Sequence, residues 1–193
     1  MIRYQILIEY VGTDFRGWQI QKKGSTIQGL IQENLSKLLK EKIILNGSGR
    51  TDTGVHAIEQ SGHFDSKKEI LDLTKFLKSI NHFINDQGVA IKKIRKRSSK
   101  FHSRFSAKQR IYKYIIFNQL SAPVIEKKRG WHVRKPLDLD LIKKGAKKLI
   151  GTHDFSTFRS SSCHAKSPIR TIKSVKVKSS KNKIEIEFRS QSF

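Results

Sequence analysis

The 193-residue sequence predicts an α+β protein built from two successive halves. Two observations support this fold class. Strand-like alternation and helix-like apolar spacing follow one another along the whole chain, and the second half begins with the same order of elements as the first. We expect residues 1–104 to form an N-terminal domain and residues 105–193 to form a C-terminal domain.

The first half opens with a strand followed by a helix. Hydrophobicity alternates over residues 3–11, which predicts a strand with four side chains on one face: Tyr4, Ile6, Ile8 and Tyr10. Ser25 and Gln28 have the spacing of a capping box. The helix that they open carries a single apolar stripe, which consists of Ile27, Leu30, Ile31, Leu35, Leu38 and Leu39.

Further elements complete the first half as βαββαβ. Short strands at residues 43–45 and 59–64 flank a glycine-rich loop at residues 47–57. A second helix begins near Asp72, and a strand returns at residues 89–94. This order is that of the ferredoxin-like or RNP-like unit, so we expect a mainly antiparallel sheet with its helices on one face.

The second half begins in the same way. A strand is predicted at residues 111–117, and Asp138 caps a helix that ends at Gly151. Strands at residues 171–177 and 183–188 form a hairpin. The order is βαββ, so we expect a second ferredoxin-like unit that lacks its last helix and strand. A fragment of a longer product, or a shortened natural form, would have this pattern.

Charge is the strongest global signal in the sequence. Forty Lys and Arg stand against 16 Asp and Glu, which gives a formal net charge of +24. Such an excess repels itself and is neutralised by a polyanion, so we expect a nucleic-acid partner. The alternative is a solvated basic surface without a partner, but the basic residues are spread through predicted helices and strands rather than gathered in a tail.

Membrane and disulfide-stabilised classes do not fit the sequence. No apolar run approaches the ~20 residues of a membrane span, and the first residues alternate too strongly for a signal peptide. The single cysteine, Cys163, excludes an internal disulfide and a cysteine-based zinc cage. We therefore expect a cytoplasmic protein without membrane contact.

Cys163 and His164 could form a nucleophile and its base, but sequence neighbours project differently and no third group orients them.

The loop at residues 47–57 is the most unusual segment of the chain. It carries three glycines, which let the backbone turn sharply and approach a ligand closely. Arg50 and Asp52 stand two residues apart, so in an extended loop the guanidinium would pair with the carboxylate and keep it ionised. An ionised carboxylate suits a nucleophile or a general base. The alternative is an aspartate that only bonds the backbone of its own turn.

Several blocks of the sequence resemble one family. Residues 49–57, Gly-Arg-Thr-Asp-Thr-Gly-Val-His-Ala, resemble the signature of the TruA-type pseudouridine synthases, which modify tRNA. Segments at residues 10–19, 101–114, 151–155 and 168–172 resemble further blocks of that family, in the same order. The resemblance extends over essentially the whole chain.

The resemblance implies an isomerase that converts uridine to pseudouridine at positions 38 to 40 of the tRNA anticodon arm, without a metal or another cofactor. Asp52 matches the family's catalytic carboxylate. Arg50 is expected to place Asp52 and the nucleotide, and Tyr112 corresponds to the tyrosine that packs on the uracil. Tyr114, on the same strand face, competes for that role. Family members act as homodimers with the tRNA across both subunits, so a homodimer is expected.

Basic side chains outside the loop are candidate RNA contacts. They are Arg16, Lys93, Arg95, Arg104 and Arg110. The alternative function is a tRNA-binding protein without turnover. This alternative is considered because residues 188–193 resemble the start of a further family block. In the family that block carries an active-site basic residue, and no position of this sequence matches that residue.

Overall fold

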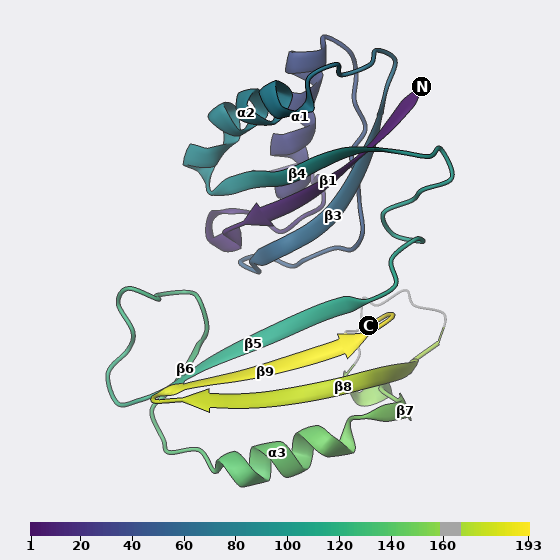
Figure 1. The fold of residues 1–193 in the computed structure, drawn as a ribbon. Coiled ribbons are helices and arrows are strands. Elements are labelled where there is room, and N and C mark those ends of the chain that lie inside the picture. The colour runs from purple at the N-terminus through teal and green to yellow at the C-terminus, as the bar shows by residue number, and fades with distance from the viewer. Residues whose placement is uncertain (159–166) are drawn as a thin grey trace. The chain divides into compact units, whose positions relative to one another are not determined.

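The computed structural model describes residues 1–158 and 167–193. The chain divides into two compact units, residues 1–107 and 108–193. Each unit has its own β-sheet, and both sheets are mainly antiparallel, which confirms the α+β fold class (Figure 1). The domain boundary expected after residue 104 lies three residues before the division between the units.

The first unit has the strand order of a ferredoxin-like domain. In spatial order, its sheet consists of β2 (Asn46–Gly47), β3 (Ala57–Ser66), β1 (Ile2–Tyr10) and β4 (Val89–Arg97). All neighbouring strands run antiparallel. With the helices α1 (Ile27–Leu39) and α2 (Leu73–Ile84), the chain order is β1-α1-β2-β3-α2-β4, which confirms the βαββαβ prediction.

Two helices, α1 (Ile27–Leu39) and α2 (Leu73–Ile84), cover one face of this sheet (Figure 1). Alternation along β1 buries the four predicted side chains in the core beneath them: Tyr4, Ile6, Ile8 and Tyr10. The helices add apolar residues at helical spacing to the same core, which are Ile27, Ile31, Leu35, Ile80 and Ile84. Short 3-10 turns follow β1 and α2, at Gly12–Asp14 and Asn85–Gln87.

The start of α1 differs from the prediction by one residue. Thr26, rather than Ser25, is the N-cap, and its hydroxyl accepts the N–H of Gly29 at 3.2 Å. Gln28 does not close a capping box, because its side-chain oxygen accepts the N–H of Ile20 at 3.1 Å rather than that of residue 25. The predicted capping box is therefore wrong, although the helix begins where expected.

The predicted strand at residues 43–45 does not pair with the sheet, and Asn46–Gly47 pairs in its place. Side chains of α1 bond this segment instead. The N–H groups of its first and last residues are accepted by Ser36 Oγ and Gln32 Oε1, each at 3.0 Å. Because these backbone groups already have helix partners, they are not available to a neighbouring strand.

The second unit has a five-stranded sheet in the order β6-β5-β9-β8-β7. Its elements include β5 (Arg110–Asn118), β6 (Trp131–Val133), β7 (Gly151–Asp154), a 3-10 turn (Ser156–Phe158), β8 (Ile169–Ser180) and β9 (Lys183–Ser190). Among the strand pairs of its described residues, only β6 and β5 run parallel. The predicted βαββ order is present as β5, the helix α3 (Leu139–Lys148), β8 and β9. The strands β6 and β7 were not predicted, because three and four residues are too few for a periodicity to show.

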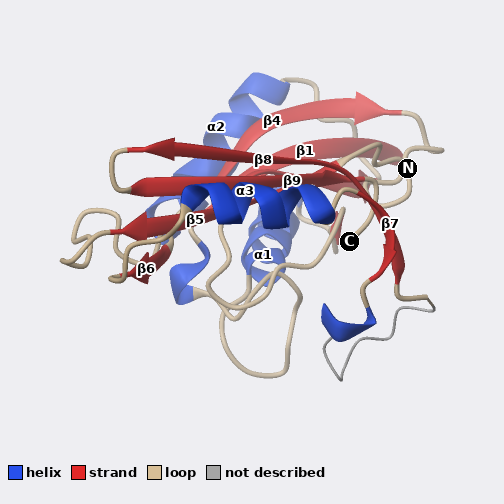
Figure 2. Cartoon of the chain, turned by 90° about the horizontal axis from the view of Figure 1, so that it is seen from below, coloured by secondary structure: helices blue, strands red, loops and turns tan. Residues whose placement is uncertain are grey.

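Helix α3 (Leu139–Lys148) lies against one face of this second sheet, over β8 (Figure 2). Asp138 caps the helix as predicted, since its carboxylate accepts the N–H groups of Asp140 and Leu141 at 2.9 and 3.0 Å. The helix ends three residues before Gly151, which has a φ of 114° and begins β7.

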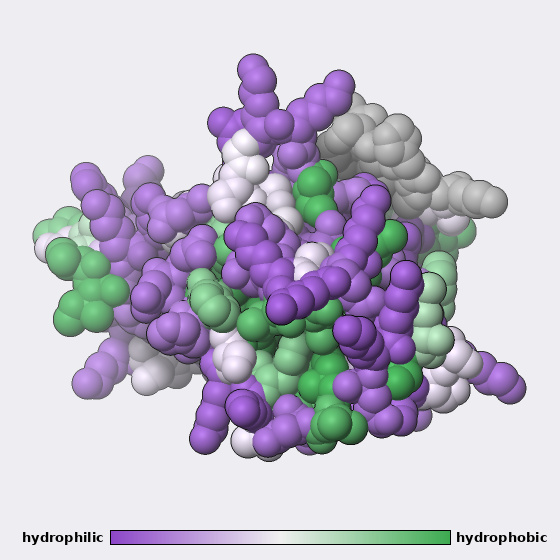
Figure 3. All heavy atoms as spheres, turned by 90° about the horizontal axis from the view of Figure 1, so that it is seen from above, coloured by the Kyte–Doolittle hydropathy of each residue, from purple (hydrophilic) through white to green (hydrophobic). Residues whose placement is uncertain are grey.

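Many of the basic residues belong to helices and strands. Helix α3 alone exposes four lysines, which are Lys143, Lys144, Lys147 and Lys148. Figure 3 shows hydrophilic side chains over most of one face of the molecule, with hydrophobic side chains exposed between them. Within the described residues, no helix has both the length and the apolar composition needed to cross a membrane.

Candidate active site

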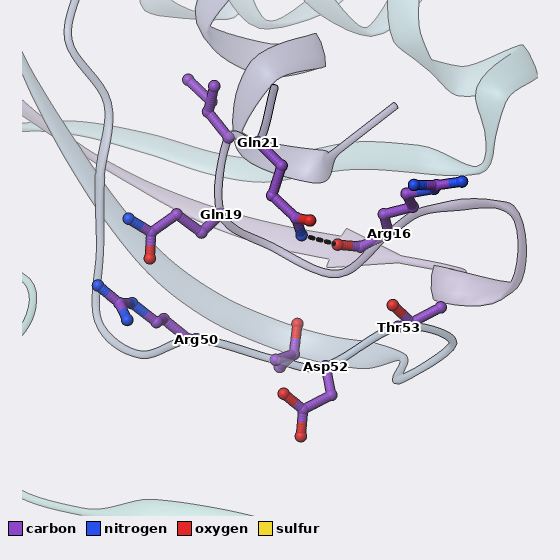
Figure 4. A pocket seen from close by; sticks show the side chains of 8 residues that line it. Arg16, Gln19, Gln21, Arg50, Asp52 and Thr53 are labelled. Carbon is purple, nitrogen blue, oxygen red and sulfur yellow. Dashed lines mark hydrogen bonds between the residues drawn. The ribbon is translucent and has the colours of Figure 1, made fainter. Parts of the chain in front are cut away.

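An open pocket of the first unit contains the predicted catalytic loop. Its volume is about 500 Å³, and two loops line it. The lining residues are Arg16, Gln19, Ile20 and Gln21, which follow β1, and Arg50, Thr51, Asp52 and Thr53, which precede β3 (Figure 4). Three predicted site residues, Arg16, Arg50 and Asp52, therefore lie at one pocket.

Asp52 stands at the first position of a tight turn. Val55 donates its N–H to the carbonyl oxygen of Asp52 at 3.2 Å, and Gly54, the third residue of the turn, has a φ of 80°. A type II turn requires a positive φ at this third position, which explains the glycine. The turn leaves the Asp52 side chain exposed at the pocket, where its carboxylate can reach a ligand.

The two loops that line the pocket are joined through their backbones. Trp18, whose ring is buried, donates its N–H to the carbonyl oxygen of Thr51 at 3.0 Å. Gly17 has a φ of 78°, and a Cβ at this position would lie 2.5 Å from the same carbonyl oxygen. Glycine is therefore required at residue 17 both by its conformation and by the close approach of the second loop.

Two buried polar side chains bond the loop at residues 47–57 from the core. The hydroxyl oxygen of Tyr10 lies 2.8 Å from Thr51 Oγ1 and donates to Gln60 Oε1 at 3.3 Å. Gln60 Nε2 in turn donates to the carbonyl oxygen of Gly49 at 3.1 Å. Neither Tyr10 nor Gln60 was predicted as a site residue. The available signal was a tyrosine, with a polar hydroxyl, on the core face of the first strand directly before a loop motif.

The direct ion pair predicted between Arg50 and Asp52 is wrong. Among the ion pairs of the described residues, none joins these two side chains. Figure 4 shows the guanidinium of Arg50 directed away from the carboxylate of Asp52. The prediction assumed an extended loop, but Thr51 is bonded through both its hydroxyl and its carbonyl oxygen, and a turn begins at Asp52. Arg50 thus adds positive charge to the pocket wall without contacting the carboxylate.

Three basic candidates of the first unit do not line this pocket. Lys93 and Arg95 flank the buried Ile94 on β4, so they lie on the sheet face opposite the helices. Arg95 Nε donates to Gln5 Oε1 at 2.9 Å. Arg104 is exposed in the segment after β4. They remain candidate contacts for RNA outside the pocket.

The remaining candidates belong to β5 of the second unit. Tyr112 is half-buried, and its ring meets the ring of Phe193 edge-on with centroids 4.7 Å apart. Tyr114 is 62% exposed, so it is the more accessible of the two tyrosines. Arg110 donates a side-chain N–H to the carbonyl oxygen of Gln191. The roles expected for these residues stay predictions.

Metal-ligating and cysteine-based chemistry have few candidate groups here. Among the residues that the structure describes, no group of three or more His, Cys, Asp or Glu side chains is arranged to hold a metal ion. Cys163 and His164 lie outside the described residues. The exposed side chain of Asp52 lines the pocket, and its catalytic role stays a prediction.

The fold and the pocket define a class of protein. A basic α+β chain with an exposed carboxylate at a pocket that two arginines also line has the features expected of an enzyme acting on nucleic acid. The family model of the tRNA pseudouridine synthases matches residues 6–106 and 146–193, which include the whole pocket. The chain belongs to the tRNA pseudouridine synthase family.

Individual relatives agree with this family. The chain is 69% identical, over all of its 193 residues and 78% of the relative's length, to tRNA pseudouridine synthase A of Pelagibacter ubique. It is 40% identical to the protein of the same name from Neorickettsia sennetsu, and 39% identical to that of a Wolbachia strain from Drosophila simulans. Each of these two matches covers 100% of this chain, and they cover 79% and 78% of the respective relatives.

Proposed function

We propose that the chain isomerises uridine to pseudouridine in tRNA, with Asp52 as the catalytic carboxylate. The observation that carries this proposal is the exposed Asp52 side chain at a pocket whose loop backbone is bonded to Trp18 and to the core. A carboxylate that is already positioned needs little reorganisation when the substrate binds. The names of the relatives support the same reaction, since the chain is 69% identical to one tRNA pseudouridine synthase A.

The reaction breaks one bond and forms another. The N-glycosidic bond between uracil N1 and ribose C1′ breaks, the base turns, and uracil C5 joins C1′. The proton on C5 is released and N1 gains a proton, so the conversion needs no oxidant or reductant. Asp52 supplies the negative group that assists the departure of the uracil from the ribose.

Substrate binding requires the target base to leave its stack, which costs a few kcal/mol. We propose that Tyr112 packs on the displaced uracil, because base–aromatic stacking contributes ~1–3 kcal/mol. Arg50, on the pocket wall, would bind a phosphate of the same nucleotide. The proposed targets are uridines 38 to 40 of the anticodon arm.

We also propose that the protein acts in the cytoplasm as a homodimer, with one tRNA lying across both subunits. The net charge of +24 supports a large anionic partner. Sedimentation velocity, with and without tRNA, checks the oligomeric state. A chain that stays monomeric in both conditions would contradict the dimer.

The function is tested by incubating the protein with an unmodified tRNA and mapping pseudouridine by carbodiimide labelling and primer extension. We expect labelled positions only within 38 to 40. A matched tRNA with cytidine at these positions is the control and should stay unlabelled. Tight tRNA binding without any pseudouridine would favour the alternative, a tRNA-binding protein without turnover.

A further inference from the structure

We infer that Tyr10 and Gln60 are positioning residues for Asp52, an inference that rests on the proposed function of that carboxylate. Their side chains are 2% and 9% exposed, and neither residue lines the pocket. They act on Asp52 through the backbone of the loop that carries it.

The number of hydrogen atoms on these side chains decides which group donates in each hydrogen bond. The Tyr10 hydroxyl has one proton, which it donates to Gln60 Oε1. Its contact with Thr51 Oγ1 is then made by the threonine hydroxyl donating to the tyrosine oxygen. Gln60 Nε2 continues the series by donating to the carbonyl oxygen of Gly49. The bonds thus run from Thr51 through Tyr10 and Gln60 to Gly49, and each one polarises the next.

This series begins and ends in the catalytic loop, on the two residues that flank Arg50. Thr51 directly precedes Asp52 and is held twice, by Tyr10 through its hydroxyl and by Trp18 through its carbonyl oxygen. Catalytic groups tolerate little displacement, since a shift of about 1 Å can reduce the rate ~100-fold. A core that fixes Thr51 therefore fixes the position from which Asp52 reaches the substrate.

Tyr4 offers a matched control on the same strand. Tyr4 and Tyr10 both lie on the core face of β1 and are 1% and 2% exposed. The Tyr4 hydroxyl accepts the N–H of Ile70 at 2.8 Å, in the segment before α2. Replacing either tyrosine by phenylalanine deprives a partly or fully buried polar group of its hydrogen-bond partner, so both changes should lower stability. Only the change at Tyr10 touches the catalytic loop.

The first measurement compares the kinetics of tRNA modification by Tyr10→Phe and Tyr4→Phe. For Tyr10→Phe we expect kcat to fall about tenfold or more, while KM for tRNA changes less than about threefold. Tyr4→Phe should keep the wild-type kcat. Equal kcat values for the two variants would overturn the positioning role.

Changes at Thr51 separate positioning from a general loss of packing. Thr51→Ser keeps the hydroxyl and should keep kcat, whereas Thr51→Val removes it and should resemble Tyr10→Phe. The double variant Tyr10→Phe/Thr51→Val should be no slower than the worse single variant, because both changes break the same bond. Fully additive losses would contradict a shared bond.

Hydrogen exchange provides a readout that does not depend on turnover. The Trp18 amide, which donates to Thr51, should exchange about tenfold faster in Tyr10→Phe and at the wild-type rate in Tyr4→Phe. Unchanged exchange in Tyr10→Phe, or faster exchange with an unchanged kcat, would refute the inference. A wild-type protein no more active than Asp52→Ala would instead refute the proposed function, and the exchange comparison would still decide whether Tyr10 holds the loop.

Discussion

The backbone N–H of Trp18 donates to the carbonyl oxygen of Thr51 at 3.0 Å, and this bond joins the two loops that line the pocket. Residue 18 follows the first strand and residue 51 precedes the third, so the pocket exists only when distant segments have folded together. Asp52 directly follows Thr51, so the position of Asp52 depends on this hydrogen bond between the two loops.

Gly17→Ala should disturb the junction directly. A Cβ at this positive-φ position would meet the carbonyl oxygen of Thr51, so we expect a loss of about 1–3 kcal/mol in the free energy of unfolding and slower modification. Gly145→Ala is the matched control, because residue 145 lies within α3 and a Cβ there would point into open space among the described residues. That change should raise stability by roughly 1 kcal/mol. Urea denaturation measures both, and a Gly17→Ala protein of wild-type stability would contradict the close approach.

The stability of the fold should depend on the protonation of His63. Burial, together with the nearby His102 and Arg3, lowers the pKa of His63 from 6.5 to about 4. The unfolded chain therefore binds a proton near pH 6.5, whereas the folded chain binds it only near pH 4. Stability should fall as the pH decreases through this window, by up to roughly 3 kcal/mol.

Replacement of His63 by glutamine tests this pH dependence. The free energy of unfolding, measured by urea denaturation between pH 7 and pH 5, should lose most of its slope in His63→Gln. His153→Gln, at an exposed histidine, should keep the wild-type slope. The hydrogen bond from Arg3 lowers the pKa of Asp65 from 3.8. The contribution of Asp65 to the free energy of unfolding is therefore lost only at a pH below this range. An unchanged slope in His63→Gln would count against this assignment.

Charge reversal on β4 should weaken tRNA binding. Lys93→Glu and Arg95→Glu are each expected to reduce affinity about uniformly across tRNAs and to lower the salt dependence of log K by ~1. Lys78→Glu makes the same charge change on α2, which covers the opposite face of the sheet, and should have the smaller effect. Filter binding over a range of salt concentrations gives the slopes. Equal effects at positions 78 and 93 would indicate a non-specific charge effect.

Tyr112 and Tyr114 can be distinguished by single truncations. If Tyr112 packs on the uracil, Tyr112→Ala should lose ~1–3 kcal/mol of transition-state stabilisation, or ~5- to 150-fold in kcat/KM. Tyr114→Ala should change kcat/KM less than about threefold. The reverse order would assign the stacking role to Tyr114.

The sequence predicted the elements that have strong periodicity. The alternation of Tyr4 to Tyr10, the stripe of α1 and the Asp138 cap are all present in the structure. Errors occurred where tertiary contacts decide the outcome. Residues 43–45 form a short apolar run that is typical of a strand, but side chains of α1 bond their backbone N–H groups. Strand β6 is too short to show a periodicity.

The sequence predicted the site residues that are close together in the chain, but not their orientation or their buried partners. The loop residues Arg50 and Asp52 were expected together, and the structure places both at one pocket with Arg16. Their relative orientation was wrong, because it depends on bonds from Tyr10 and Trp18 that sequence spacing does not reveal. For the same reason, Tyr10 and Gln60 were not predicted to belong to the site.

The most direct test of Asp52 is the release of tritium from tRNA labelled at uracil C5, because each isomerisation frees that hydrogen. Asp52→Asn keeps the size of the side chain and removes its charge. Asp14→Asn, at an exposed aspartate of the neighbouring loop, is the matched control. We expect wild-type and Asp14→Asn proteins to release tritium at similar rates and Asp52→Asn to release none above background. Tritium release by Asp52→Asn at the wild-type rate would contradict Asp52 as the catalytic carboxylate.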